Sequence, residues 1–348
     1  MSGASDRLAS LKVGVAAIAV IAGAFALWAL RHILTPFALA VFLLLVIDGS
    51  AKALTRRLRL PPRVALIAAI AIVVAFFGVT IWIVADNAGQ IARESGGYTA
   101  RIDVLLQMTG DRLGLKEAPS LSGLFHQIDP GRYAGVLAGG VGHVAEGAVF
   151  TLIYLGFMLA SRRGFQAKSR ELFGEGGERS EAIMVFRRVE RGVESYIWVQ
   201  TMIGLMIAAA SAVLMWTVGL SHVLFWSFLI FLANYIPAIG AAVGVLIPPL
   251  FGIVELDALW KPIVLLVALE AVHFTVSHVV QPRMQGKSLN IDPIVVLLAL
   301  AFWGVIWGLG GAFLSTPLTV IVMAICAEFP ATRPLAVLLS EDGRPYSA

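Results

Sequence analysis

Residues 222–252 read HVLFWSFLIFLANYIPAIGAAVGVLIPPLFG, a run of 31 residues with no Asp, Glu, Lys or Arg. A straight helix of this length would measure about 46 Å, whereas the hydrocarbon core of a bilayer is about 30 Å thick. The middle of the run holds residues that interrupt helices, namely Asn234, Pro237, Gly240, Gly244 and Pro248. Proline removes a helical hydrogen bond and glycine permits a sharp turn, so the run predicts two helical segments joined by a break.

A second overlong run, 293–326, repeats this pattern. It is interrupted at Gly308, Gly310, Gly311 and Pro317. A pair of interrupted apolar segments is typical of the binding site of a membrane transporter, and either segment could be a re-entrant hairpin. The alternative is one long, tilted and kinked helix whose glycines allow close helix packing.

The composition of the whole chain agrees with a membrane protein. Of 348 residues, 59% are hydrophobic and 14% are charged, against about 45–50% and about 25% in soluble domains. Further runs long enough to span a bilayer lie at 12–30, 33–49, 64–85, 141–160, 196–218 and 262–280. We therefore expect an all-α, polytopic protein with seven or eight membrane segments.

The runs divide the chain into three regions. Residues 1–85 hold the first three spans, and 86–140 form an amphipathic segment outside the cytoplasm. Residues 141–348 hold the remaining spans, with a charged helical connection at 161–195 and the predicted transport core at 222–326.

Lysine and arginine placement predicts the orientation. Basic residues are concentrated in the connections 50–63 and 161–195, which two crossings separate. The positive-inside tendency then places both connections and the N-terminus in the cytoplasm, with the chain in a bacterial inner membrane. Tryptophans near the span ends are expected to anchor at the membrane surface; these are Trp28, Trp82, Trp198 and Trp260.

The run 262–280 carries the most chemistry. Glu270, His273, Ser277 and Gln281 follow at i, i+3, i+7 and i+11, which places them on one face of a regular helix. An ionisable residue inside a span is costly and suggests function, and a Glu–His pair could exchange a proton near neutral pH. The alternative is a polar contact that only fixes packing. Asn234 could cap a half-helix or bind solute, and Gln200 and Thr201 are weaker polar candidates.

Several function classes lack support. The chain has no HExxH, GxSxG or GxxxxGK[ST] motif, so we expect no enzyme activity and no ATP-driven transport. The histidines show no metal-ligand spacing, and Cys326 is the single cysteine, so neither a metal nor another cofactor is expected. The net charge of +4 comes without a basic stripe, which argues against a nucleic-acid partner.

Three ordered motifs carry a family resemblance. The first is the stretch Asn234 to Gly240 with Gly244 and Pro248. The second contains Pro282 and Gly286, followed by Pro293 and Val295–Val296. The third begins at Phe302-Trp303-Gly304 and continues through Gly308, Gly310 and Gly311 to Pro317. In these motifs the chain resembles the autoinducer-2 exporter family of permeases.

The resemblance implies a multi-span permease for small solutes. Some members are linked to export of autoinducer-2 and others to exchange of sodium or lithium for protons. It also implies a homo-oligomer, a pentamer, that works by an elevator-like motion. The Glu270–His273 pair lies outside these motifs, so the resemblance does not assign it a role.

We therefore predict a secondary-active exporter of a small polar solute. The two broken segments and the polar face of 262–280 would enclose the site, and Glu270 would carry a coupling proton. One alternative is a sodium or lithium/proton antiporter that uses the same carboxylate. Another is a non-transporting scaffold or sensor that uses 86–140 for interactions.

Overall fold

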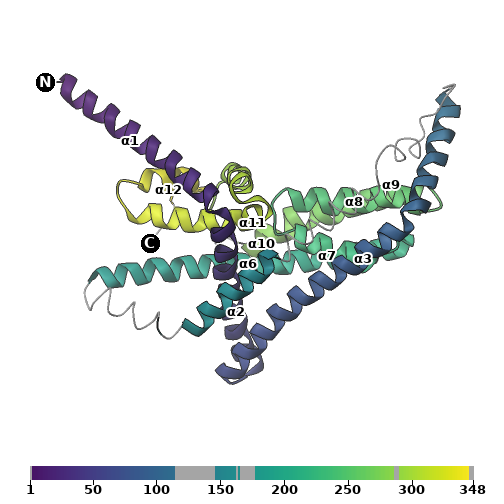
Figure 1. Ribbon diagram of the computed structural model, residues 1–348, viewed down its shortest axis with the longest axis horizontal. Coiled ribbons are helices and arrows are strands. Elements are labelled where there is room, and N and C mark those ends of the chain that lie inside the picture. Colours follow the sequence, from purple (N-terminus) through teal and green to yellow (C-terminus); the bar gives the residue numbers. More distant parts are fainter. Residues whose placement is uncertain (1, 114–145, 162–163, 165–176, 286–289, 345–348) are drawn as a thin grey trace. The chain divides into compact units, whose positions relative to one another are not determined.

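The computed structural model describes residues 2–113, 146–161, 164, 177–285 and 290–344 (Figure 1). These residues are helical almost throughout and include no strand. The helices are α1 (Ser2–Ala29), α2 (Arg31–Leu58), α3 (Pro62–Leu113), Glu146–Ser161, α6 (Gly177–Val218), α7 (Val223–Ala233), α8 (Ile239–Glu255), α9 (Trp260–Thr275), the π-helical turn η1 (Val276–Val280), α10 (Gln281–Gln285), α11 (Pro293–Glu328) and α12 (Arg333–Leu339).

Five helices are long and apolar enough to cross a membrane. They are Arg31–Leu58, Pro62–Ile83, Glu190–Val218, Trp260–Met284 and Pro293–Glu328, and shorter apolar helices accompany them. Many large apolar side chains on them are exposed, as expected where lipid is the solvent. The predicted all-α, polytopic membrane architecture is confirmed.

The chain forms two compact units. Unit 1 comprises Met1–Leu44, Phe150–Val185 and Ile291–Ala348, and unit 2 comprises Leu45–Val149 and Phe186–Asn290. Each broken segment predicted above belongs to one unit, 222–252 to unit 2 and 293–326 to unit 1. The three regions expected from the sequence stay a prediction.

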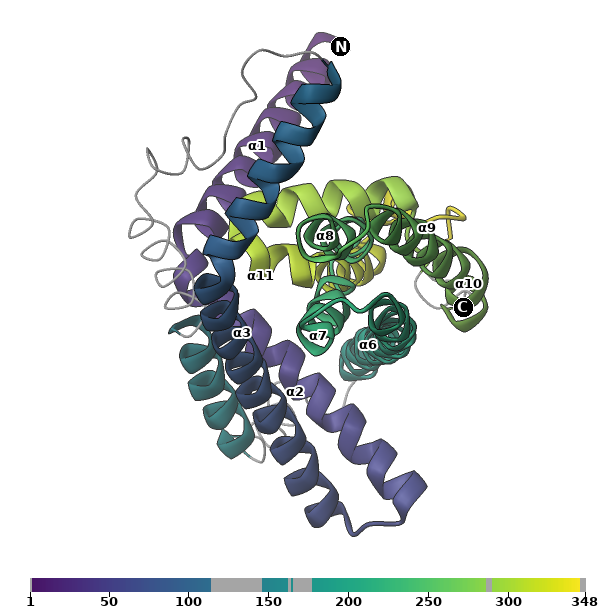
Figure 2. The same cartoon turned by 90° about the vertical axis from the view of Figure 1, so that its right-hand side faces the viewer.

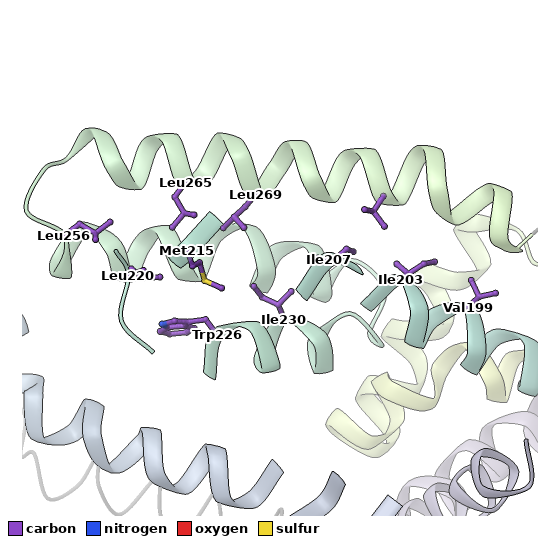
Figure 3. Packing of buried hydrophobic residues seen from close by; sticks show 11 residues of the cluster. Val199, Ile203, Ile207, Met215, Leu220, Trp226, Ile230, Leu256, Leu265 and Leu269 are labelled. Atoms are coloured by element: carbon purple, nitrogen blue, oxygen red, sulfur yellow. The ribbon is translucent and has the colours of Figure 1, made fainter. Parts of the chain in front are cut away.

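The core of unit 2 is a cluster of apolar side chains on α6, α7 and α9 (Figure 3). On α6, buried residues recur every fourth position, at Val199, Ile203 and Ile207. This spacing places them on one stripe of a helix, and Leu265 and Leu269 on α9 belong to the same cluster. The core thereby fixes the helices that flank the break in 222–252.

Helix α3 continues beyond the predicted span 64–85, as one helix from Pro62 to Leu113. No proline interrupts it after its start, and its glycines weaken a helix without ending it. Its extension contacts the rest of unit 2, since Asn87 Oδ1 lies 3.0 Å from His222 Nδ1 and Arg101 donates to the carbonyl of Asp257 at 3.3 Å. Residues 114–140 of the predicted amphipathic segment lie outside the described residues.

In unit 1, α11 turns back on itself at Gly308 (Figure 2). Gly308 has φ 62° and ψ −143°, a conformation open essentially to glycine alone. A Cβ on Gly304 would lie 4.0 Å from that of Ala312, eight residues later, whereas a straight helix separates such residues by about 12 Å. The predicted break is confirmed here, and the two arms form a hairpin.

The hairpin needs glycine at two further predicted positions. A Cβ on Gly311 would lie 2.7 Å from the carbonyl carbon of Trp303 and closer still to its oxygen. A Cβ on Gly310 would meet the side chain of Thr35 on α2. Asp292 begins the hairpin as an N-cap, accepting from the Ile294 amide at 2.7 Å, ahead of Pro293 at the first helical position.

The prolines behave differently from the prediction. Pro317 lies inside the second arm of α11, and Pro248 lies inside α8, so neither ends its helix. A single proline removes only one hydrogen bond, and in apolar helices the surrounding structure can satisfy the freed carbonyl. The chain reverses instead at Gly308 and in the non-helical turn between α7 and α8.

Candidate functional site

The break between α7 and α8 is a hairpin within unit 2 (Figure 2). A Cβ on Gly244 would lie 3.4 Å from the side chain of Ile230, so residues 14 positions apart are neighbours. The turn is tight, because a Cβ on Gly240 would lie 2.6 Å from the Cα of Asn234. Helix α7 has 11 residues and measures about 16 Å, too short to cross a bilayer. The predicted break is therefore confirmed as a hairpin.

Ala238 holds the strained point of this turn. It has φ 61° and ψ −42°, and the Ile239 amide donates to the Pro237 carbonyl at 2.7 Å around it. Together these define a γ-turn with positive φ at its central residue, a conformation that is rare and unfavourable for a residue with a Cβ. Strain kept at one backbone position often accompanies function, so the turn is a candidate site.

Replacing Ala238 by glycine should relieve this strain. We expect Ala238→Gly to raise the free energy of unfolding by roughly 1 kcal/mol, because glycine adopts positive φ without a steric penalty. Thermal unfolding of the purified protein in detergent measures it. Ala241→Gly, three residues later in α8, should instead lower stability by a similar amount. A loss of stability in both variants would contradict the strain at Ala238.

Polar side chains of α6 line the break. The Gln200 amide donates to the Asn234 carbonyl, and the Tyr196 hydroxyl donates to the Tyr235 carbonyl at 3.4 Å. The Thr201 and Tyr235 hydroxyls lie 2.6 Å apart. The freed backbone of the turn is thus satisfied by side chains, as an irregular backbone at membrane depth requires. We call Tyr196, Gln200, Thr201, Asn234 and Tyr235 the break cluster.

One buried donor of the break cluster has no partner. Asn234 is 8% exposed, and its Nδ2 atom makes no hydrogen bond within the described structure. A Cβ on Gly204 of α6 would lie only 3.4 Å from that atom, so the absence of a side chain leaves room beside it. A buried unpaired amide costs about 1–3 kcal/mol. An acceptor supplied by a bound solute would recover this cost.

His273 packs against the α7–α8 hairpin at Gly244, whereas Glu270 is exposed. His273 is buried, with its Cε1 atom 3.4 Å from where a Cβ on Gly244 would stand. Glu270 is exposed on α9, next to the buried Leu269 in sequence and hence about 100° around the helix from it. The expectation that Glu270 faces the interior of the helix bundle therefore does not hold for the isolated chain. The buried face of α9 includes His273, whereas Glu270 lies at the edge of that face.

The π-helical turn η1 also disturbs the predicted polar face. Ser277 lies within η1 and Gln281 directly after it, and both are half-buried. A π turn inserts an extra residue per turn, so positions after it no longer align with Glu270 at α-helical spacing. Pro282 lies inside α10 and does not end the helical path, and Gly286 lies outside the described residues.

Unit 1 has its own buried polar group after the Gly308 turn. Ser315 and Thr319 donate to carbonyls of their own helix at 2.8 and 2.7 Å, whereas the buried Thr316 Oγ1 has no partner within the described structure. Thr316, Tyr196 and the Tyr235 hydroxyl were not predicted as site residues from the sequence. The signal that could have identified them was their polarity inside otherwise apolar helices.

No group of three or more potential metal ligands lies together in the described ranges.

Comparison with known proteins decides the family. A sequence profile of the AI-2E family transporters matches residues 17–331, nearly the whole chain. The chain belongs to the AI-2E transporter family. The predicted resemblance is thereby confirmed, and the protein is a multi-pass membrane transporter by family.

Two relatives match this AI-2E transporter over most of its length, and a third matches about half of it. AI-2 transport protein TqsA of Escherichia coli is 25% identical over 316 residues, covering 89% of this chain and 90% of TqsA. A protein of Haemophilus influenzae named "Putative transport protein" is 25% identical over 340 residues, covering 94% and 95%. The E. coli protein named "Putative transport protein YhhT" is 31% identical over 164 residues, or 46% and 45%.

Proposed function

We propose that this AI-2E transporter is a secondary-active permease that binds a small, neutral, polar solute at the break cluster of unit 2. The observation that carries the proposal is the buried Asn234 side-chain amide at a helical hairpin, whose Nδ2 has no partner in the described part of the chain. The Gln200, Thr201 and Tyr235 side chains stabilise the turn around that amide. Broken helices with half-buried polar groups are where transporters bind their substrates.

The chemistry of the cluster favours a hydroxyl-rich solute over an ion. Its members are amides and hydroxyls, and none carries a charge at neutral pH. The unpaired atom is a donor, which attracts an oxygen acceptor and repels a cation. Autoinducer-2 (AI-2), the solute in the name of TqsA, is the first candidate.

The proposal is tested by export from proteoliposomes. Purified protein is reconstituted in vesicles loaded with autoinducer-2, and the solute outside is measured over time. We expect efflux several times faster than from protein-free vesicles, driven further by an imposed pH gradient. Equal efflux with and without protein would reject the solute and favour the scaffold or sensor alternative.

A sodium or lithium/proton antiporter remains the second candidate because Glu270 is a carboxylate within an apolar span. Its neighbours Val267 and Phe274 are exposed and apolar. An ionisable group at membrane depth is costly and is typical of a coupling site. We propose that Glu270 carries the coupling proton in either case.

Neutralising Glu270 tests this role. We expect Glu270→Gln to reduce proton-coupled transport at least about tenfold, since glutamine cannot release a proton. Vesicles with a trapped pH dye, challenged with external sodium and then with autoinducer-2, identify the coupled substrate. Glu328→Gln, at the end of α11, is the matched control. Unchanged pH responses in Glu270→Gln would remove Glu270 from the mechanism.

The remaining expectations accompany this proposal. They are a bacterial inner membrane with a cytoplasmic N-terminus, a homo-oligomer, and an elevator-like movement. A joint site built from both broken segments also stays a prediction.

A further inference from the structure

A cavity of about 510 Å³ lies where α2 meets α6 in unit 2. Its lining residues are Ala53, Arg56 and Arg57 of α2 and Trp198 of α6. Ala53 precedes the arginines by three and four positions, so each arginine is a neighbour of Ala53 on the surface of α2. The volume is within the range of small-ligand sites, about 300–1,000 Å³. The cavity is separate from the break cluster, and we call it the arginine pocket.

The arginine pocket carries uncompensated positive charge. The neighbouring Lys52 is paired with two carboxylates, those of Glu190 and Glu194 on α6, at 2.9 and 2.8 Å. Together with the two arginines, these groups keep a net positive charge. Arg56 and Arg57, by contrast, form no ion pair with any carboxylate in the described ranges. Two guanidinium groups that line one pocket suit a phosphate, whose oxygens accept paired N–H donors.

Tryptophan 198 supplies the second wall and an apolar surface. The Arg57 guanidinium carbon lies 5.3 Å from the centre of the Trp198 ring, a cation–π contact that fixes the pocket. Trp198 is exposed, so its ring remains available to a ligand. A ligand here would meet positive charge on one side and an aromatic surface on the other.

Both walls lie where their helices change from apolar to charged. Helix α2 has no charged residue from Ile33 to Ile47, and Asp48 and its last basic residues follow. Helix α6 has its last charge at Glu194 and then continues into its span. Tryptophan and arginine at such transitions lie at the depth of lipid headgroups. The pocket therefore opens at the level where a phospholipid presents its phosphate.

We propose that the arginine pocket binds the headgroup phosphate of an anionic phospholipid. Basic pockets between membrane helices bind such headgroups. Arg56 and Arg57 hold the phosphate, and Trp198 contacts the glycerol and the start of the acyl chains. The lipid then connects α2 to α6 and stabilises unit 2. This inference is independent of the proposed solute site.

The test titrates the full-length protein in detergent with phosphatidylglycerol and follows its thermal unfolding midpoint. We expect a rise in the midpoint that saturates with lipid and is absent with phosphatidylcholine. The apparent affinity of Arg56→Gln/Arg57→Gln should be at least about tenfold weaker, since each basic residue near a lipid surface contributes about 1 kcal/mol. Arg63→Gln, a basic residue nearby that does not line the pocket, should behave as wild type.

Other outcomes overturn the inference. An equal midpoint rise in the double variant would place the lipid elsewhere. An equal rise with phosphatidylcholine would make the effect nonspecific, and the same rise with inorganic phosphate alone would make the pocket a site for a free anion. Native mass spectrometry of lipid adducts on Arg56→Lys/Arg57→Lys, which keeps the charge, guards against loss of folding. That variant should retain more bound phosphatidylglycerol than the glutamine variant.

Discussion

Replacing Asn234 by leucine should reduce solute export by about tenfold to hundredfold, while the protein still assembles in the membrane. The size of the effect follows from the loss of one hydrogen bond to bound solute, about 1–3 kcal/mol. Folding should tolerate the change, because Asn234 Nδ2 makes no hydrogen bond to any described residue and the turn is held through the Asn234 backbone carbonyl. The measurement is initial efflux of autoinducer-2 from proteoliposomes with equal protein content.

A matched control separates binding from packing in this experiment. Thr217→Val removes a hydroxyl from α6 that only donates to its own helix, at the carbonyl of Leu214, and should export normally. Thr201→Val removes the contact to the Tyr235 hydroxyl and should have an intermediate effect. Full export by Asn234→Leu would exclude the break cluster as the solute site, whatever the control shows.

Gly311→Ala should destabilise the protein by about 3 kcal/mol or more, among the largest effects of a single methyl group. The added Cβ would stand 2.7 Å from the Trp303 carbonyl carbon and 2.8 Å from the Trp307 Cβ. Both are close to the turn at Gly308, so neither can move aside without opening the α11 hairpin. Overpacking of this kind usually costs about 1–3 kcal/mol and more where backbone is involved.

The thermal unfolding midpoint in detergent and the yield of folded protein measure this effect. Gly156→Ala is the control, since a Cβ on Gly156 would meet nothing within 4 Å. That substitution lies in helix Glu146–Ser161 and should raise helix stability slightly. Equal midpoints for Gly311→Ala and wild type would mean that α11 crosses as one kinked helix.

Much of the fold could be predicted from patterns along the amino-acid sequence. The apolar runs gave the spans because hydropathy and length alone decide whether a helix can cross a bilayer. The breaks at Pro237 and Gly308 could be predicted because overlong runs must be interrupted. The prediction of helix breaks at Pro248 and Pro317 was wrong, since a proline weakens a helix locally but does not by itself reverse the chain.

The candidate site was only partly predictable. Asn234 was identified from its position in the break, and Gln200 and Thr201 from polarity inside an apolar span. Their convergence at one turn depends on how α6 packs against the α7–α8 hairpin, which no spacing along the chain encodes. Thr316 and the Tyr235 hydroxyl were missed for the same reason.

By itself, the sequence determined that this chain is helical, membrane-spanning and interrupted at two places. It did so because the bilayer imposes one length and one polarity on every span, and glycine and proline mark departures from them. Only the tertiary structure decided that the interruptions are hairpins, that the buried Asn234 Nδ2 has no partner among the described residues, and that Glu270 is exposed beside a buried His273. These depend on which helix faces pack together and on the register shift at η1, and such contacts join residues far apart in the chain.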